Sequence, residues 1–199
     1  MQHKKFSFWL FCVGFIYISL VMFILSSFSY SGYRILSNTT SQLGAQSSPY
    51  AWVMNSAFAL MGIAVVISFW GSLRHKYYED ILPIIFGLSF VMVAIFQHEP
   101  GITGLAYNHT TALLHSVFAT MMGIVISVYA IIKAMKANST TDRILAVLAL
   151  VSASGLSFLM YAVPAYTGLL QRIMFLSVLA WIGYLVVSMQ SAKSVPSDS

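Results

Sequence analysis

The chain has 199 residues, of which 59% are hydrophobic and only 8% are charged, whereas soluble domains average roughly 25% charged residues. Ten Lys and Arg with five Asp and Glu are too few to cover a water-exposed surface, so the composition excludes a soluble globular protein. The formal net charge of +5 comes from basic residues scattered between apolar runs and not from a patch, so nucleic acid is not expected as a partner.

Six apolar stretches are each about 20 residues long, enough to cross a hydrocarbon core of about 30 Å as a helix. None contains Asp, Glu or Lys. Because a bilayer offers no water to an open backbone, each is expected to be helical, which gives an all-α polytopic integral membrane protein with six transmembrane helices in one bundle. The predicted spans are 6–28, 50–72, 81–97, 109–132, 144–164 and 172–190.

The first predicted span follows Lys4 and Lys5, an arrangement that resembles the charged region of a secretory signal. Its apolar run is longer than a signal's usual 7–15 residues, so we expect the helix to be retained. The alternative is cleavage near residues 29–31, where small residues stand at suitable spacing. The whole chain, 1–199, is interpreted as one domain ending in a short flexible cytoplasmic tail at 191–199.

Basic residues are distributed unevenly between the two sides of the predicted membrane. Two, Arg34 and Arg172, lie on one side, and eight lie on the other. By the positive-inside rule this bias predicts a multi-pass protein of the cell membrane with both termini in the cytoplasm. The segment 74–80 is interpreted as a solvated cytoplasmic turn. The eight residues are Lys4, Lys5, Arg74, Lys76, Lys133, Lys136, Arg143 and Lys193.

The predicted outer side gathers polar residues at or just beneath the membrane surface. Polar side chains at membrane depth cost free energy unless they find partners, so they usually face the interior of the bundle. We therefore predict an outward-facing polar pocket, made by the first long loop and the outer ends of the second, fourth and sixth helices. The candidate residues are Ser41, Asn55, His98, Glu99, His109, Thr111, His115, Gln171 and Arg172.

His115 is expected about two turns inside the fourth helix, if that helix begins near Asn108. Asn108, Thr111 and His115 would share one face, with His109 about 120° away, so the two histidines do not form a same-face metal pair. No metal site is predicted, and a second ligand would have to come from another helix, as from His98. The open interpretations are an acid/base role, a neutral histidine bonded between helices, and an interfacial residue.

Rows of small residues follow three of the predicted helices. Asn55, Ala59 and Gly62 form a stripe that permits close helix approach, with the Asn55 amide free to bond across it. A structural role for Asn55 is favoured over ligand binding. The other rows are interpreted as packing seams and not as cofactor sites; they are Ser116, Thr120, Gly123 and Ser127 in the fourth helix, and Ala149, Ala153 and Ser157 in the fifth.

Gln171 and Arg172 are expected to open the last helix on the outer side, where a positive-inside protein should avoid arginine. Such a charge needs a partner. Glu99 is the acidic residue on that side, so an Arg172–Glu99 ion pair is one interpretation. The other is that the planar guanidinium binds a lipid phosphate or a carboxylate. The sequence leaves both open.

The segment Ser41-Gln42-Leu43-Gly44 is expected to cap a re-entrant or interfacial turn, with Gly44 adopting a backbone conformation that other residues resist. Ser41 as a nucleophile with His115 as its base is a disfavoured alternative, because no G-x-S-x-G elbow surrounds it. N-x-T sequons at Asn38 and Asn108 face the same side.

Four short motifs stand in order along the chain: Ser41-Gln42-Leu43-Gly44, Pro49-Tyr50-Ala51-Trp52 leading to Asn55, His115, and Gly168-Leu169-Leu170-Gln171-Arg172. In these motifs the chain resembles the domain of unknown function 998 family of bacterial and archaeal membrane proteins. The resemblance would cover nearly all of the chain and implies a six-helix membrane protein without an established activity, distantly similar to six-helix families implicated in lipid-anchor remodelling. Family members often carry a polar residue or histidine one turn before the fourth-helix histidine, where this chain has Thr111.

The leading functional hypothesis is a pocket that binds a lipid headgroup or small amphiphile, with Arg172 as the anion contact and membrane lipids as partners. The alternative is a membrane-embedded lipid-modifying enzyme that uses His115 as acid/base, with or without a metal. Transport is not favoured, because no ionisable residue lies at the midplane of a span and no mid-span proline occurs except Pro83, which stands near a helix start. Whether the protein is an enzyme, its cofactors and its oligomeric state are left open.

Overall fold

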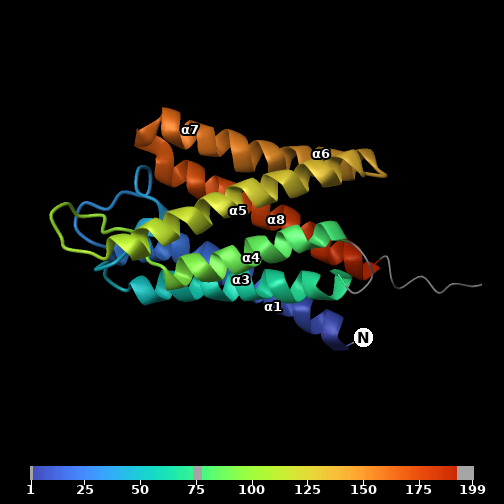
Figure 1. The fold of residues 1–199 in the computed structure, drawn as a ribbon, viewed down its shortest axis with the longest axis horizontal. Coiled ribbons are helices and arrows are strands. Elements are labelled where there is room, and N and C mark those ends of the chain that lie inside the picture. The colour runs from blue at the N-terminus through green and yellow to red at the C-terminus, as the bar shows by residue number, and fades with distance from the viewer. Residues whose placement is uncertain (1, 74–77, 192–199) are drawn as a thin grey trace, which may run out of the picture.

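The computed structural model describes residues 2–73 and 78–191 and consists there of helices joined by loops and short turns (Figure 1). Nearly all of the predicted tail at 191–199, together with Arg74 and Lys76, lies outside the described residues. The principal helices are α1 (Gln2–Ile24), α3 (Ala51–Leu73), α4 (Ile81–Ile95), α5 (His109–Met135), α6 (Thr140–Leu150), α7 (Leu156–Ala162) and α8 (Thr167–Ser191).

Six segments of the described chain are long and apolar enough to cross a membrane, which confirms the predicted all-α, six-span fold. The fifth span combines α6 and α7 and the sixth begins at Pro164. The bounds are Lys5–Phe28, Ala51–Gly71, Tyr78–Ile95, His109–Met135, Thr140–Ala162 and Pro164–Met189.

The helix ends show where the predicted boundaries hold and where they move. The fourth span starts as expected, because the Asn108 side chain caps it by accepting the Thr111 backbone N–H at 3.0 Å. The last helix starts earlier than predicted, at Thr167, after a 3-10 turn at Pro164–Tyr166. Gln171 and Arg172 therefore lie inside α8 and do not open it.

The fifth span is interrupted near its middle by a π-helical segment, Val151–Gly155, which separates α6 from α7. The segment contains no proline, so the sequence offered no signal for this break. π-Helical turns insert an extra residue into the helix and are frequent at functional sites. Here the turn contributes Ala153 and Ser154 to the lining of a cavity beside α5.

The tightest helix pair is α3 with α4, which meet through glycine. A Cβ added at Gly62 would lie 2.4 Å from the carbonyl oxygen of Gly87, and one added at Gly87 would lie 2.7 Å from that of Gly62. The stripe through Gly62 is therefore a close helix contact, as predicted. Beside it the rings of Phe58, Phe90 and Phe175 pack together, with centroids 5.6–6.3 Å apart.

The bundle has two different ends. The loops of residues 29–50 and 96–108 gather at one end, on the left of Figure 1, which we name the long-loop end. The N-terminus lies at the opposite end. There Lys133 pairs with Asp80 (3.4 Å) and Lys136 pairs with Glu79 (3.2 Å). The predicted cytoplasmic location of this second end stays a prediction.

Asp80 departs from the expected solvated turn. Its side chain is buried, accepts a hydrogen bond from the Tyr129 hydroxyl at 2.8 Å, and faces Lys133. Tyr129 and Lys133 stand four residues apart on α5, so both reach the same carboxylate from one helix face. That spacing is the signal in the sequence from which the contact could have been inferred.

Candidate functional site

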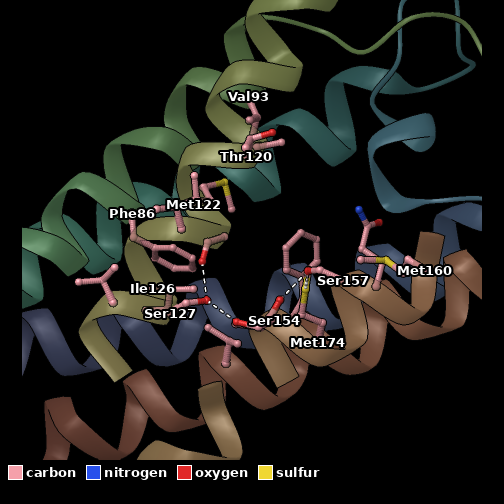
Figure 2. A pocket seen from close by; sticks show the side chains of 18 of the residues that line it. Phe86, Val93, Thr120, Met122, Ile126, Ser127, Ser154, Ser157, Met160 and Met174 are labelled. Carbon is pink, nitrogen blue, oxygen red and sulfur yellow. Dashed lines mark hydrogen bonds between the residues drawn. The ribbon is translucent and has the colours of Figure 1, made fainter. Parts of the chain in front are cut away.

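A cavity of about 670 Å³ lies within the bundle, between α5 on one side and the π-helical segment, α7 and α8 on the other. Its lining is mainly apolar, and it includes no Asp, Glu, Lys or Arg. Figure 2 shows Phe86 and Met122 on one wall, with Ser157 and Met174 on the facing wall. Most ligand pockets combine such an apolar lining with a few polar groups.

The cavity takes the place of two predicted packing seams. Thr120, Gly123 and Ser127 of α5 line it, and so do Ala153 and Ser157 of the fifth span. A Cβ at Gly123 would meet no atom within 4 Å, so no helix packs on this glycine. The main contacts of α5 are with α4 and α6, while α7 packs on α8. This arrangement leaves space between α5 and the α7–α8 pair.

Three serine hydroxyls that line the cavity, those of Ser127, Ser154 and Ser157, have hydrogen-bond partners. Ser127 Oγ of α5 lies 2.9 Å from Ser154 Oγ of the π-helical segment (Figure 2) and donates to the Gly123 carbonyl. Ser157 also contacts the sulfur of Met174, at 3.4 Å. Because these hydroxyls have partners, this region of the cavity accommodates apolar groups without leaving polar atoms exposed to them.

Three predicted site residues, Ser41, His115 and Gln171, line the cavity. His115 is buried, and its Nδ1 lies 2.7 Å from the Phe96 carbonyl oxygen and 3.2 Å from that of Val93. A carbonyl can only accept, so Nδ1 carries the proton and Nε2 of the neutral ring is an acceptor. The Ser41 hydroxyl, 3.1 Å away, donates to Nε2.

Gln171 is held in one orientation from the opposite side. Its Oε1 accepts hydrogen bonds from both the backbone N–H and the hydroxyl of Thr40, each at 2.7 Å. This double contact identifies the other terminal atom as the amide nitrogen. Within the described chain that nitrogen donates to no partner.

Ser41 stands on α2 (Thr40–Leu43), a single helical turn in the first long loop. The predicted turn is present, but its cap is Thr39, which exchanges capping-box hydrogen bonds with Gln42. Ser41 is thereby left free to face His115.

Gly44 ends the turn with φ of −95°, so the expectation of an unusual backbone conformation is wrong. Glycine is needed there for space, because a Cβ would lie 2.3 Å from Oδ1 of Asn55. The Asn55 amide donates to the Gly44 carbonyl at 3.0 Å. Asn55 therefore anchors the loop and does not line the cavity.

Replacing Gly44 with Ala is expected to lower the stability of the purified protein by about 1–3 kcal/mol, because the added methyl displaces Asn55 and strains the loop. Thermal unfolding in detergent measures the change. Gly123→Ala is the matched control, since its Cβ meets open space. A Gly44→Ala melting temperature equal to that of Gly123→Ala would contradict the contact.

Arg172 is fully buried and bonds to its own chain. Its Nε donates to the carbonyl of Met22 at 3.0 Å, and its Nη2 donates to the Tyr33 hydroxyl at 2.6 Å. Its Nη1 lies 2.9–3.1 Å from the carbonyl oxygens of Ile35, Asn38 and Gly168.

Of the two interpretations of Arg172, the ion pair with Glu99 is wrong. Glu99 instead accepts a hydrogen bond from the Tyr107 hydroxyl at 3.1 Å. The guanidinium lies among backbone carbonyls of α1, the first loop and α8, which supply its partners without a carboxylate. It does not line the cavity, so the proposed anion contact has no exposed donor. Burial raises the pKa of Tyr33, although the charge and hydrogen bond of Arg172 oppose the shift.

His98, Glu99 and Thr111 do not line the cavity. His98 and Glu99 border a smaller hollow of about 230 Å³ at the long-loop end, together with Tyr107 and His109. The His98 ring packs edge-on against that of His115, with centroids 5.2 Å apart. Within residues 2–73 and 78–191, no group of three or more His, Cys, Asp or Glu could hold a metal ion.

Comparison with known proteins identifies one family. The sequence model of the family described as "Protein of unknown function (DUF998)" matches residues 9–188. No curated protein and no solved structure matches the chain.

Proposed function

The chain belongs to the DUF998 family, whose function is unknown, and we propose that it binds a membrane lipid or similar amphiphile in the cavity. The acyl chain would occupy the apolar part between α5 and α8. The polar part would contact Ser41, His115 and Gln171. The observation that carries the proposal is a mainly apolar cavity of about 670 Å³ with these three polar side chains in its lining. One of them, Gln171, has an amide N–H that donates to no described residue, because only its Oε1 is bonded to Thr40.

The size and lining of the cavity suit such a ligand. Pockets for small molecules measure roughly 300–1,000 Å³ and are mostly apolar. An acyl chain that comes from the bilayer is already out of water, so the apolar lining lets it enter without a desolvation cost, and close packing favours it there.

Access from the membrane is supported by the exposure of the α5 lining residues. Ile124 and Val128 line the cavity, yet they are 60% and 42% exposed. Both lie within a predicted span, so the exposed surface would face acyl chains of the bilayer. A lipid would then enter sideways, without passing through the loops at the long-loop end.

The absence of charge from the cavity lining refines the choice of ligand. The sequence favoured a headgroup bound by Arg172, but that guanidinium bonds to carbonyls elsewhere. Ser41, His115 and Gln171 offer a hydroxyl, an imidazole and an amide, and the other polar side chains of the lining are also hydroxyls. Neutral groups of this kind match the ester or hydroxyl oxygens of a lipid better than a phosphate, which favours arginine or lysine.

Filling the cavity is expected to abolish lipid binding. Gly123→Phe places a ring where a Cβ now meets open space, and photolabelling by a diacylglycerol with an acyl-chain diazirine should fall at least roughly tenfold, a loss of about 1.4 kcal/mol in affinity. Gly71→Phe, also on a helix with open space around its Cβ but outside the cavity lining, is the control. Equal labelling of the two variants would contradict the proposed lipid binding in the cavity.

A further inference from the structure

The hydrogen bond between Ser41 and His115 has the geometry of an activated nucleophile. We propose that Ser41 and His115 form the nucleophile and general base of an acyl-transfer site that acts on carboxylic esters of lipids bound in the cavity. This inference rests on the proposed lipid binding, because the same cavity must hold the acyl chain. It adds a reaction to the binding site.

The imidazole is oriented for this role by the backbone. Both carbonyls that accept from Nδ1–H, those of Val93 and Phe96, belong to the end of the third span, while His115 itself comes from α5. They select the tautomer whose Nε2 lone pair faces Ser41 Oγ at 3.1 Å. A nucleophile, a base and a third group that orients the base are the minimum set for a covalent acyl-transfer mechanism.

Ser41 has few alternative reasons to face His115. The turn of α2 is already capped by Thr39 and is tied to α8 through Thr40 and Gln171. The loop therefore does not depend on the Ser41 hydroxyl for its shape. The hydroxyl is half-buried and lines the cavity, so a bound ester could reach it.

Gln171 supplies a donor for the oxyanion. Its Oε1 is occupied by Thr40, and its Nε2 donates to no described residue. A preorganised amide N–H directed at the developing charge stabilises a tetrahedral intermediate without reorganisation. Gln171 therefore completes the set of groups that the reaction requires.

The reaction balances with the groups present and an ester. Ser41 Oγ attacks the ester carbonyl carbon while its proton passes to His115 Nε2, and the carbonyl electron pair moves onto the oxygen beside Gln171. On collapse the bond to the alcohol oxygen breaks, and that oxygen takes the proton from His115. Water or a second alcohol then attacks the acyl–Ser41 ester while it gives its proton to His115. The bond between Ser41 Oγ and the acyl carbon breaks, and His115 returns that proton to Ser41 Oγ, which releases the acyl product and restores both residues.

The test uses an alkyl fluorophosphonate and the full-length protein in detergent micelles. Serine attack on phosphorus expels fluoride, and the modified residue is identified by mass spectrometry. We expect Ser41 to be labelled in the unmodified protein. His115→Gln should slow labelling at least roughly 100-fold, as expected for loss of a general base. Gln171→Glu keeps an acceptor for Thr40 but removes the donor, and should slow labelling by about 10²–10³-fold.

The control is Ser116→Ala, because that hydroxyl bonds to its own helix at Ala112 and does not line the cavity. It should leave the rate unchanged. Absence of label on Ser41 in the unmodified protein would overturn the inference, and this reading does not depend on any variant folding. If the diacylglycerol probe still distinguishes Gly123→Phe from Gly71→Phe, lipid binding survives that failure. If it does not, the proposed function fails as well.

Discussion

Replacing Arg172 with Ala is expected to lower the free energy of unfolding by roughly 3–5 kcal/mol, the cost typical of breaking a buried charged network. The side chain is fully buried and bonds to four carbonyl oxygens and the Tyr33 hydroxyl. Without the guanidinium these acceptors lose partners that water cannot replace, and each unsatisfied group costs about 1–3 kcal/mol.

Arg172→Lys is expected to lower the free energy of unfolding by nearly as much as Arg172→Ala. Lysine carries three donors on one nitrogen, whereas the partners of Arg172 surround a planar group with several nitrogens. Thermal unfolding in detergent compares the variants. Arg34→Ala is the control, because Arg34 is an exposed arginine in the first loop, which Arg172 contacts. If Arg172→Lys unfolds at the same temperature as Arg34→Ala, the guanidinium network does not stabilise the fold.

The second large effect is expected at the crossing of α3 and α4. Gly62→Ala would place a methyl 2.4 Å from the Gly87 carbonyl oxygen. This oxygen belongs to the helix backbone, so it cannot move aside as a flexible side chain could. The helices must separate, at a cost of about 1–3 kcal/mol for overpacking. Alanine favours helix over glycine, so intrinsic propensity predicts the opposite sign.

Gly71→Ala on the same helix separates the two effects, because a Cβ there meets nothing within 4 Å. It should leave the melting temperature unchanged or raise it, while Gly62→Ala lowers it. Since Gly62 and Gly87 share one contact, the double variant should lose less stability than the sum of the single variants. Additive losses would show that the two glycines do not form a common crossing.

The network around Arg172 also bears on the candidate site. The contacts that attach the first loop to the helices include those of Arg172 with the Asn38 carbonyl, Gln171 with Thr40, and Asn55 with the Gly44 carbonyl. Asn38 and Thr40 precede Ser41, and Gly44 follows it. The loop is thus fastened on both sides of the residue that faces His115, which preorganises Ser41 for binding or reaction.

Residues that the sequence grouped at one side of the membrane separate into three roles. Ser41, His115 and Gln171 line the cavity, Asn55 and Arg172 hold the loop, and His98 and Glu99 border a separate hollow. The topology could place them near one surface because spans and loops follow from hydropathy alone. It could not divide them, because each role depends on a partner distant in the chain.

The six spans, their helical state and the start of α5 at its Asn108 cap were determined by the sequence itself. Each depends on neighbouring residues: a run of apolar side chains needs lipid or core around it, and a capping side chain bonds its own helix. Only the tertiary structure decided what the small residues do. Gly62 meets a carbonyl of α4, whereas Gly123 meets empty space. Both are glycines in apolar helices, and whether a facing helix approaches depends on how distant segments pack.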